Sequence, residues 1–181
     1  MALGLLFMLA SGLFMVNAEI PKADQFRLYQ LHKAAGVVML VAIFARLLIR
    51  VFTHQPALPA QMPANQQKLA KLGHVGLYAL LVSIPLAGWV MVSASPFGLP
   101  TFVFVDWLKW PHIPGIARNK EIEAIAKAAH WYLGLTLMLM LTVHIGAFFL
   151  HKQKQGIKLI HRMWWNGLLY QSYAADKRSN V

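Results

Sequence analysis

The segment that decides the fold is AAHWYLGLTLMLMLTVHIGAFFLH, residues 128–151, which contains no Asp, Glu, Lys or Arg. A helix needs about 20 mostly apolar residues to cross about 30 Å of hydrocarbon, and this segment is long enough. Its histidines, His130, His144 and His151, are spaced by fourteen and seven residues, which places them along one face of a helix with 3.6 residues per turn. The segment therefore predicts a membrane-spanning helix that carries histidines near both ends.

Three further apolar segments, residues 1–18, 31–52 and 72–94, have a similar character. The first lacks the positive start of a signal peptide, so we expect it to be retained as a short or truncated first helix. The polar residues that end at Lys127 can begin the fourth helix early. The sequence thus predicts an all-α integral membrane four-helix bundle with up-down topology. Residues 1–151 would form this transmembrane domain, and residues 152–181 a basic cytoplasmic tail.

The composition separates this chain from soluble proteins, because 58% of its residues are hydrophobic and only 13% are charged. Soluble domains carry about 25% charged residues. The net charge is +11, and a strongly basic chain is also typical of nucleic-acid-binding proteins. Such proteins do not need long uncharged apolar segments, so we expect no nucleic-acid partner. The absence of cysteine excludes iron–sulfur clusters, Cys-ligated zinc and c-type haem.

The basic residues are unevenly distributed along the chain. The second link, the helix ends beside it and the tail hold ten of the seventeen Lys and Arg residues but only one of the six acidic residues. Because short loops rich in Lys and Arg stay in the cytoplasm, this distribution predicts a membrane protein with both termini cytoplasmic. The first and third links, about residues 19–30 and 95–127, would then face outward.

Histidines within the apolar segments are functional candidates, because ionisable groups are costly in a bilayer. With four antiparallel helices, His32 and His130 lie at the outer level, and His74 and His144 lie at the inner level. Two facing imidazoles can hold an iron porphyrin through both axial positions. Small residues flank these histidines and suit either a flat macrocycle or close helix packing. We expect the remaining histidines to be solvated surface residues: His54, His112 and His161.

Zinc or copper transport is the competing interpretation of these histidines. A four-coordinate zinc site needs several His or carboxylate ligands at one depth. The four apolar segments contain no Asp or Glu, and their histidines fall into pairs. The pattern therefore favours haem with two histidine ligands over zinc.

The motifs around these histidines, LHKAAG at residues 31–36, GHVGLY at 73–78 and AHWYLG at 129–134, resemble those of the bacterial cytochrome b561 family. Members of this family are four-helix inner-membrane proteins with two b-type haems, and the resemblance covers nearly the whole chain. It implies that His32 and His130 ligate the outer haem and that His144 is one ligand of the inner haem.

The family's usual partner for the inner histidine lies at the start of the first helix, and this chain has no such residue. That position would fall just upstream of Met1, so we expect either an earlier start of the chain or a loss of this ligand. His74 would then substitute. The resemblance further implies that His151 belongs to a quinone site. Arg46 and Arg50 would serve as partners of haem propionates or of quinone headgroups, or as membrane anchors.

The resemblance implies electron transfer through two b-type haems between a periplasmic donor and the ubiquinone pool. Because the family includes a superoxide oxidase, the donor could be superoxide, and Lys33 and Lys127 would attract this anion or anchor the helices at the interface. Two alternatives remain open. One is an anchor subunit that receives electrons from a periplasmic hydrogenase or dehydrogenase, docked on the loop with Trp107 and Trp110. The other is a haem-free histidine transporter or structural membrane subunit.

Overall fold

The computed structural model describes residues 1–53 and 63–155. In these ranges it contains four helices: α1 (Ala2–Asn17), α2 (Lys22–Phe52), α3 (Ala64–Ala94) and α4 (Lys120–Gln155). Two strands of two residues each, β1 (Thr101–Phe102) and β2 (Lys109–Trp110), form an antiparallel pair between α3 and α4. The expectation of an all-α membrane protein with four helices is confirmed, whereas the small β-ribbon was not predicted.

Three helices of the described ranges are long and apolar enough to cross a membrane, and α1 is a shorter apolar helix of 16 residues. At 1.5 Å per residue α1 extends about 24 Å, less than the hydrocarbon thickness of about 30 Å. Many large apolar side chains are exposed along these helices, which is the pattern of helices whose outer faces contact lipid.

The predicted segments 31–52, 72–94 and 128–151 each lie inside a longer helix. The helices begin earlier because their first turns are stabilised by local chemistry rather than by apolar burial. Pro21 and Pro63 precede α2 and α3 with backbone angles that lead into a helix. At the start of α4, Asn119 Oδ1 accepts hydrogen bonds from the N–H groups of Glu121 and Ile122, each at 3.1 Å, as N-cap residues do.

The chain divides into two compact units, Met1–Met140 and Leu141–Val181. The second unit is described only as far as Gln155, where it consists of the last part of α4. The predicted basic tail at 152–181 lies outside the described residues from 156 onward, as do His54 and His161.

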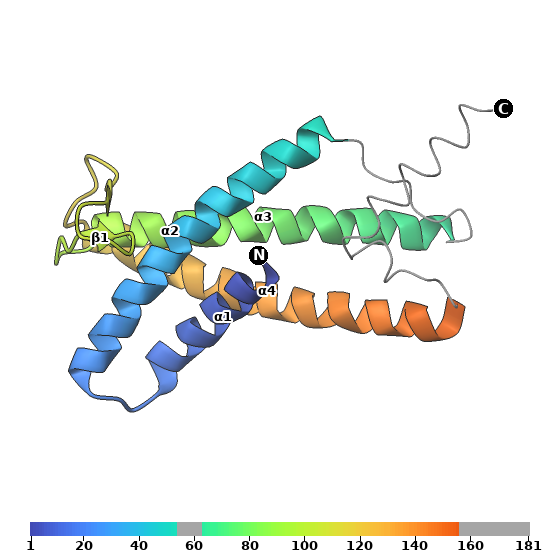
Figure 1. Cartoon of the computed structure of the whole chain (residues 1–181), viewed down its shortest axis with the longest axis horizontal. Helices are drawn as coiled ribbons and strands as arrows, with labels where there is room; N and C mark the ends of the chain where they lie inside the picture. The colour runs from blue at the N-terminus through green and yellow to red at the C-terminus, as the bar shows by residue number, and fades with distance from the viewer. Residues whose placement is uncertain (54–62, 156–181) are drawn as a thin grey trace. The chain divides into compact units, whose positions relative to one another are not determined.

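Within the first unit, α1 runs antiparallel beside the N-terminal part of α2 (Figure 1). A Cβ atom on Gly4 would meet the Met39 side chain, and one on Gly36 would meet the Met8 side chain. Farther along α1, the Met15 carbonyl accepts a hydrogen bond from the Gln25 side chain at 3.0 Å. The residue numbers rise on one helix as they fall on the other, so α1 forms a hairpin with α2.

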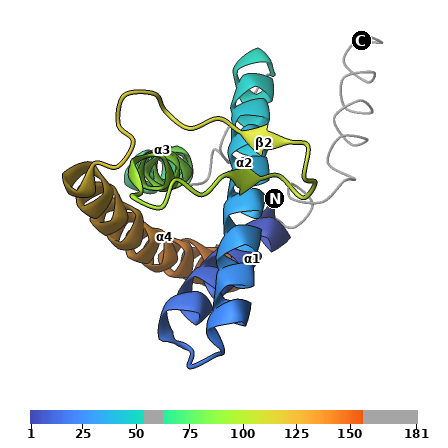
Figure 2. The same ribbon diagram turned by 90° about the vertical axis from the view of Figure 1, so that its left-hand side faces the viewer.

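The α3–α4 loop, residues 95–119, carries the β-ribbon and lies against α2 and α3 (Figure 2). Thr101 pairs with Trp110 in the ribbon, and β1 packs against α2. On the other side of the loop, Trp89 on α3 donates a hydrogen bond to the Pro111 carbonyl at 2.8 Å. The loop is therefore fixed to two of the long helices.

Candidate functional site

His32 on α2 and His130 on α4 lie together, with ring centroids 6.3 Å apart and ring planes inclined by 79°. We call these two residues the histidine pair. Both side chains are partly buried. The pairing that the sequence predicted at the outer level is thus present as a close contact between helices that are far apart in the chain.

The ring of His32 is held by α1. Ser11 is the only buried residue of α1, with 6% of its surface exposed, and its Oγ lies 2.9 Å from His32 Nδ1. The same hydroxyl donates to the Met8 carbonyl at 3.2 Å. When its single proton is directed to Met8, the Ser11 oxygen accepts from an Nδ1–H group on His32. This arrangement leaves a lone pair on His32 Nε2.

The ring of His130 is held by α3. His130 Nδ1 lies 2.8 Å from the Ile84 carbonyl oxygen, and a carbonyl can only accept, so Nδ1 carries the proton. In the neutral ring Nε2 then carries the lone pair. Both members of the histidine pair are therefore oriented through Nδ1 and have Nε2 in the form that binds a metal, the arrangement by which second-shell partners orient metal-binding histidines.

Two glycines leave room beside the histidine pair. A Cβ atom on Gly12 would lie 3.4 Å from His32 Cε1, and a Cβ atom on Gly88 would lie 3.1 Å from two atoms of the His130 ring. The second distance is shorter than ordinary van der Waals contact. A side chain at residue 88 would therefore push against His130.

Two of the small residues that flank the predicted ligands, Gly36 and Gly76, face methionine side chains of other helices. A Cβ on Gly36 would meet Met8 at 3.4 Å, and one on Gly76 would meet Met140 at 3.1 Å. Of the two interpretations left open for these glycines, close helix packing fits Gly36 and Gly76. The glycines that face the histidine pair, Gly12 and Gly88, were not recognised from the sequence.

The histidine pair fits an iron porphyrin. His32 Nε2 is buried and has no hydrogen-bond partner among the described residues, as expected of an atom that binds a group not included in the structure. With metal–nitrogen bonds of about 2 Å, two imidazoles on opposite sides of one ion have centroids about 6 Å apart, which is close to the separation observed. Residues 1–53 and 63–155 contain no cluster of three or more metal-binding side chains. Two protein ligands suit a metal cofactor such as an iron porphyrin, because the porphyrin ring supplies the other donor atoms to the iron.

Two of the predicted inner-level residues of the first unit, Arg46 and Arg50, contact Tyr78 and form a second cluster. Arg46 Nε donates to Tyr78 Oη at 3.1 Å, and the Arg50 guanidinium lies 5.2 Å from the centroid of the Tyr78 ring. His74 is exposed and precedes Tyr78 by one helical turn on α3. We call Arg46, Arg50 and Tyr78 the arginine–tyrosine cluster. Its tyrosine stands within the GHVGLY motif but was not predicted from the sequence.

His144 and His151 lie on the part of α4 that belongs to the second unit. His144 is exposed, and the His151 side chain lies outside what the structure describes. Among the predicted ligands in the described ranges, the structure therefore brings His32 and His130 into contact. The roles predicted for His74, His144 and His151 remain predictions.

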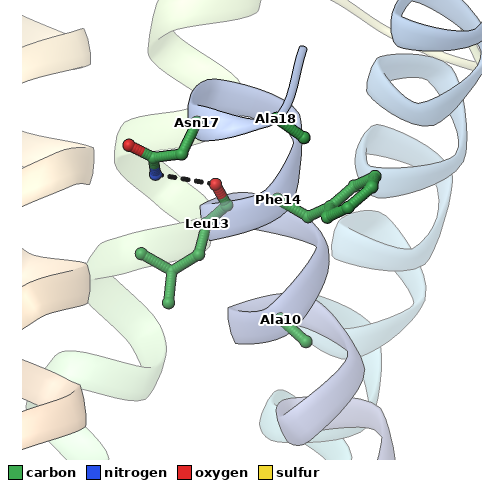
Figure 3. Close-up of a pocket in the computed structure, with 5 residues that line it drawn as sticks. All are labelled: Ala10, Leu13, Phe14, Asn17 and Ala18. Carbon is green, nitrogen blue, oxygen red and sulfur yellow. Dashed lines mark hydrogen bonds between the residues drawn. The ribbon is translucent and has the colours of Figure 1, made fainter. Parts of the chain in front are cut away.

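A shallow surface hollow on α1 is separate from the histidine pair (Figure 3). Its lining residues are Ala10, Leu13, Phe14, Asn17 and Ala18. The only polar side chain among them, Asn17, donates to the Leu13 carbonyl at 2.8 Å. The residues of α1 that contact His32 are not part of this lining, and no titratable group is present in it.

The comparisons with known proteins all indicate the same family. A sequence profile of the prokaryotic cytochrome b561 family matches residues 1–166. The chain is 29% identical to cytochrome b561 homolog 2 of Escherichia coli K12 over 139 residues, which cover 76% of this chain and 70% of that protein. It is 28% identical to cytochrome b561 homolog 1 of the same strain over 132 residues, covering 73% and 72% of the two chains.

Proposed function

The chain belongs to the prokaryotic cytochrome b561 family, and from this premise we propose that it carries electrons across the membrane through b-type haem, with His32 and His130 as the axial ligands of one haem. The family implies a bacterial membrane protein that binds b-type haem. The assignment of the ligands is supported by one observation, the close contact of the histidine pair.

When bound, a haem iron supplies the one-electron carrier, and the chain supplies its surroundings. Ser11 and the Ile84 carbonyl hold the two rings through Nδ1, so each Nε2 is available to the iron. Gly12 and Gly88 keep adjacent helices clear of the rings. His32 and His130 would therefore hold the haem through two neutral imidazole nitrogens.

A second, inner haem with His144 as one ligand and His74 as the other belongs to the same proposal. In the sequence, His130 and His144 are fourteen residues apart, which in one continuous helix corresponds to about 21 Å of rise, a suitable spacing for one haem near each membrane surface. The arginine–tyrosine cluster supports an anionic or quinone partner at this level, because Tyr78 fixes Arg46 and Arg50 next to the turn that carries His74. His151 would contribute to the quinone site.

The orientation follows the distribution of charge. The acceptor would be ubiquinone of the inner membrane, with both termini on the cytoplasmic side and the α3–α4 loop facing outward. The proposal is supported by the excess of Lys and Arg in the second link and the tail. In this orientation the histidine pair carries the outer haem.

Superoxide is the proposed donor, and two lysines support it. Lys33 follows His32 directly and is partly buried, and Lys127 is exposed one turn before His130. Reversing both charges with Lys33→Glu and Lys127→Glu is expected to slow reduction of the haem by superoxide, because the anion would be repelled. Dithionite reduction and haem content should stay unchanged. Stopped-flow reduction at several salt concentrations measures the effect, and a rate equal to that of the unaltered protein would contradict steering by these lysines.

A periplasmic protein donor is the second candidate, and it is favoured by exposed aromatic residues in the outward loop. Trp107 is 80% exposed, and Phe97 and Phe104 are also exposed. Such residues are enriched where protein partners dock. In that case a partner dehydrogenase or hydrogenase would deliver the electrons, and free superoxide would reduce the protein poorly.

The haem-to-protein ratio and the dithionite-reduced spectrum of the purified protein test the proposal. Expression with ample haem should give a b-type spectrum, with two haems per chain if His74 substitutes as the inner ligand and one if it does not. A protein purified without a Soret band would overturn the proposal in favour of a haem-free transporter or structural subunit.

A further inference from the structure

The two rings of the histidine pair are nearly perpendicular, with planes inclined by 79° and centroids 6.3 Å apart. An imidazole that binds a metal through Nε2 can still turn about the metal–nitrogen bond. Its Nδ1–H group lies off that axis, so the position of the atom that accepts from Nδ1 decides the direction of the ring plane. The two acceptors therefore decide the angle between the planes.

His32 and His130 take their acceptors from different helices. Ser11 Oγ on α1 lies 2.9 Å from His32 Nδ1, and the Ile84 carbonyl oxygen on α3 lies 2.8 Å from His130 Nδ1. The second acceptor is a backbone atom, which a side-chain substitution does not remove. The first is a hydroxyl group that the single residue Ser11 supplies.

A glycine stands near each acceptor and faces the same edge of the ring. Gly12 directly follows the serine, and a Cβ atom on it would lie 3.4 Å from His32 Cε1. Gly88 lies about one turn beyond Ile84, and a Cβ atom on it would lie 3.1 Å from Cε1 and Nδ1 of His130. Because Cε1 adjoins Nδ1, each helix contacts its ring along the edge that makes the hydrogen bond. This edge contact restricts rotation of the ring further.

Ser11 is a fixed acceptor. It is buried, with 6% of its surface exposed, and its hydroxyl donates to the Met8 carbonyl of its own helix at 3.2 Å. With the proton directed to Met8, the oxygen accepts from His32. Farther along α1, the hydrogen bond from Gln25 to the Met15 carbonyl, at 3.0 Å, joins this helix to α2, which carries His32.

His112 belongs to the α3–α4 loop and not to this arrangement. Its Nε2 atom is buried and has no hydrogen-bond partner among the described residues, so the expectation that His112 is a solvated surface residue was wrong. The physical reason is that the loop is bound to α3 next to this histidine, where the Ile113 N–H group donates to Ser93 Oγ at 3.0 Å.

We propose that Ser11 is a positioning residue that holds the His32 ring nearly perpendicular to the His130 ring and thereby sets the electronic state of the haem they ligate. This inference rests on the proposed function, because it requires that haem. In low-spin ferric iron, one of the d orbitals that overlap the imidazole π systems holds a single electron. Parallel imidazole planes separate these orbitals in energy, whereas perpendicular planes make them nearly equal. The perpendicular arrangement therefore withholds a stabilisation from the ferric state and favours the reduced haem.

Ser11→Ala tests the proposal through the electron paramagnetic resonance spectrum of the oxidised protein. Nearly perpendicular planes give a strongly axial signal with one dominant low-field feature, and we expect this signal from the outer haem of the unaltered protein. Without the hydroxyl the His32 ring can turn, so the signal should become rhombic and its low-field feature should move to higher field. The haem-to-protein ratio should stay the same, because His32 still offers Nε2 to the iron.

Three further variants make this result specific. Ser11→Thr keeps a hydroxyl and should retain the axial signal. Thr136→Ala is the matched control, because it removes a hydroxyl that donates to the Tyr132 carbonyl of its own helix at 2.8 Å, and it should leave the spectrum unchanged. His32→Leu should abolish the axial signal, which assigns that signal to the outer haem.

The proposal is overturned if Ser11→Ala keeps the axial signal, or if the haem that His32→Leu removes has a rhombic signal in the unaltered protein. A loss of haem in Ser11→Ala that Ser11→Thr does not restore would also overturn it, since Ser11 would then serve packing alone. Failure of the proposed function looks different. In that case the unaltered protein would contain no haem, or His32→Leu would leave all of its haem in place.

Discussion

Replacement of His32 by leucine is expected to remove one b-type haem from each chain. Leucine fills a similar volume but offers no lone pair, so the iron would lose one axial ligand and the haem would no longer be retained. His130→Leu should cause the same loss, because both residues ligate one iron. The haem-to-protein ratio from the reduced spectrum measures the effect in purified protein.

The double variant gives the sharper result. If His32 and His130 share one haem, the double variant should lose no more haem than either single variant, since the effects of residues that act as a unit are not additive. Val38→Ala, a half-exposed position on the same helix, is the control and should keep all of the haem. A double variant that loses twice as much haem as each single variant would assign the two histidines to different haems.

Replacement of Gly88 by leucine is the second change with a large expected effect. The first atom of any side chain at this position would lie 3.1 Å from the His130 ring, and leucine adds three more carbon atoms. The ring would be displaced from the Ile84 carbonyl that orients it. Loss of an orienting contact typically costs 10- to 100-fold in metal affinity, so we expect about a 10-fold or greater loss of outer-haem affinity.

Ala79→Leu is the matched control for this variant. Residue 79 is exposed on the same helix, and nine residues at 100° each place it on the face opposite Gly88. Haem retention during dilution or detergent washing compares the two variants. Equal retention in Gly88→Leu and Ala79→Leu would show that the space beside His130 is not needed for haem.

The sequence was sufficient to predict the helices and the histidine pair, for identifiable physical reasons. Apolar segments must bury their backbone polar groups in helices when they cross a bilayer, so length and composition predicted four helices. His32 and His130 stand near the ends of segments that meet at the same depth, so alternation of helix direction was enough to pair them. The polar first turns of α2 and α3 were missed because apolar content marks the hydrocarbon region, whereas backbone hydrogen bonding continues beyond it. The early start of α4, ahead of Lys127, was expected from the sequence.

The residues that complete the site could not be recognised from the sequence. Ser11 stands alone in an apolar helix, and its partner is 21 residues away in the chain, so nothing local distinguishes it from a tolerated serine. Gly88 resembles a packing glycine until α4 places His130 against it. Tyr78 acts through two arginines of another helix. Such contacts depend on the angle and rotation of packed helices, which hydrophobic patterns do not define.

The central claim, that His32 and His130 are the two axial ligands of one haem, is tested most directly by near-infrared magnetic circular dichroism of the oxidised protein. This method identifies the axial ligands of low-spin ferric haem. We predict that the unaltered protein shows the band of bis-imidazole ligation. The variants His32→Leu and His130→Leu should each lose the part of this band that comes from the haem they share. A spectrum without bis-imidazole ligation, or one that either substitution leaves unchanged, would contradict the claim.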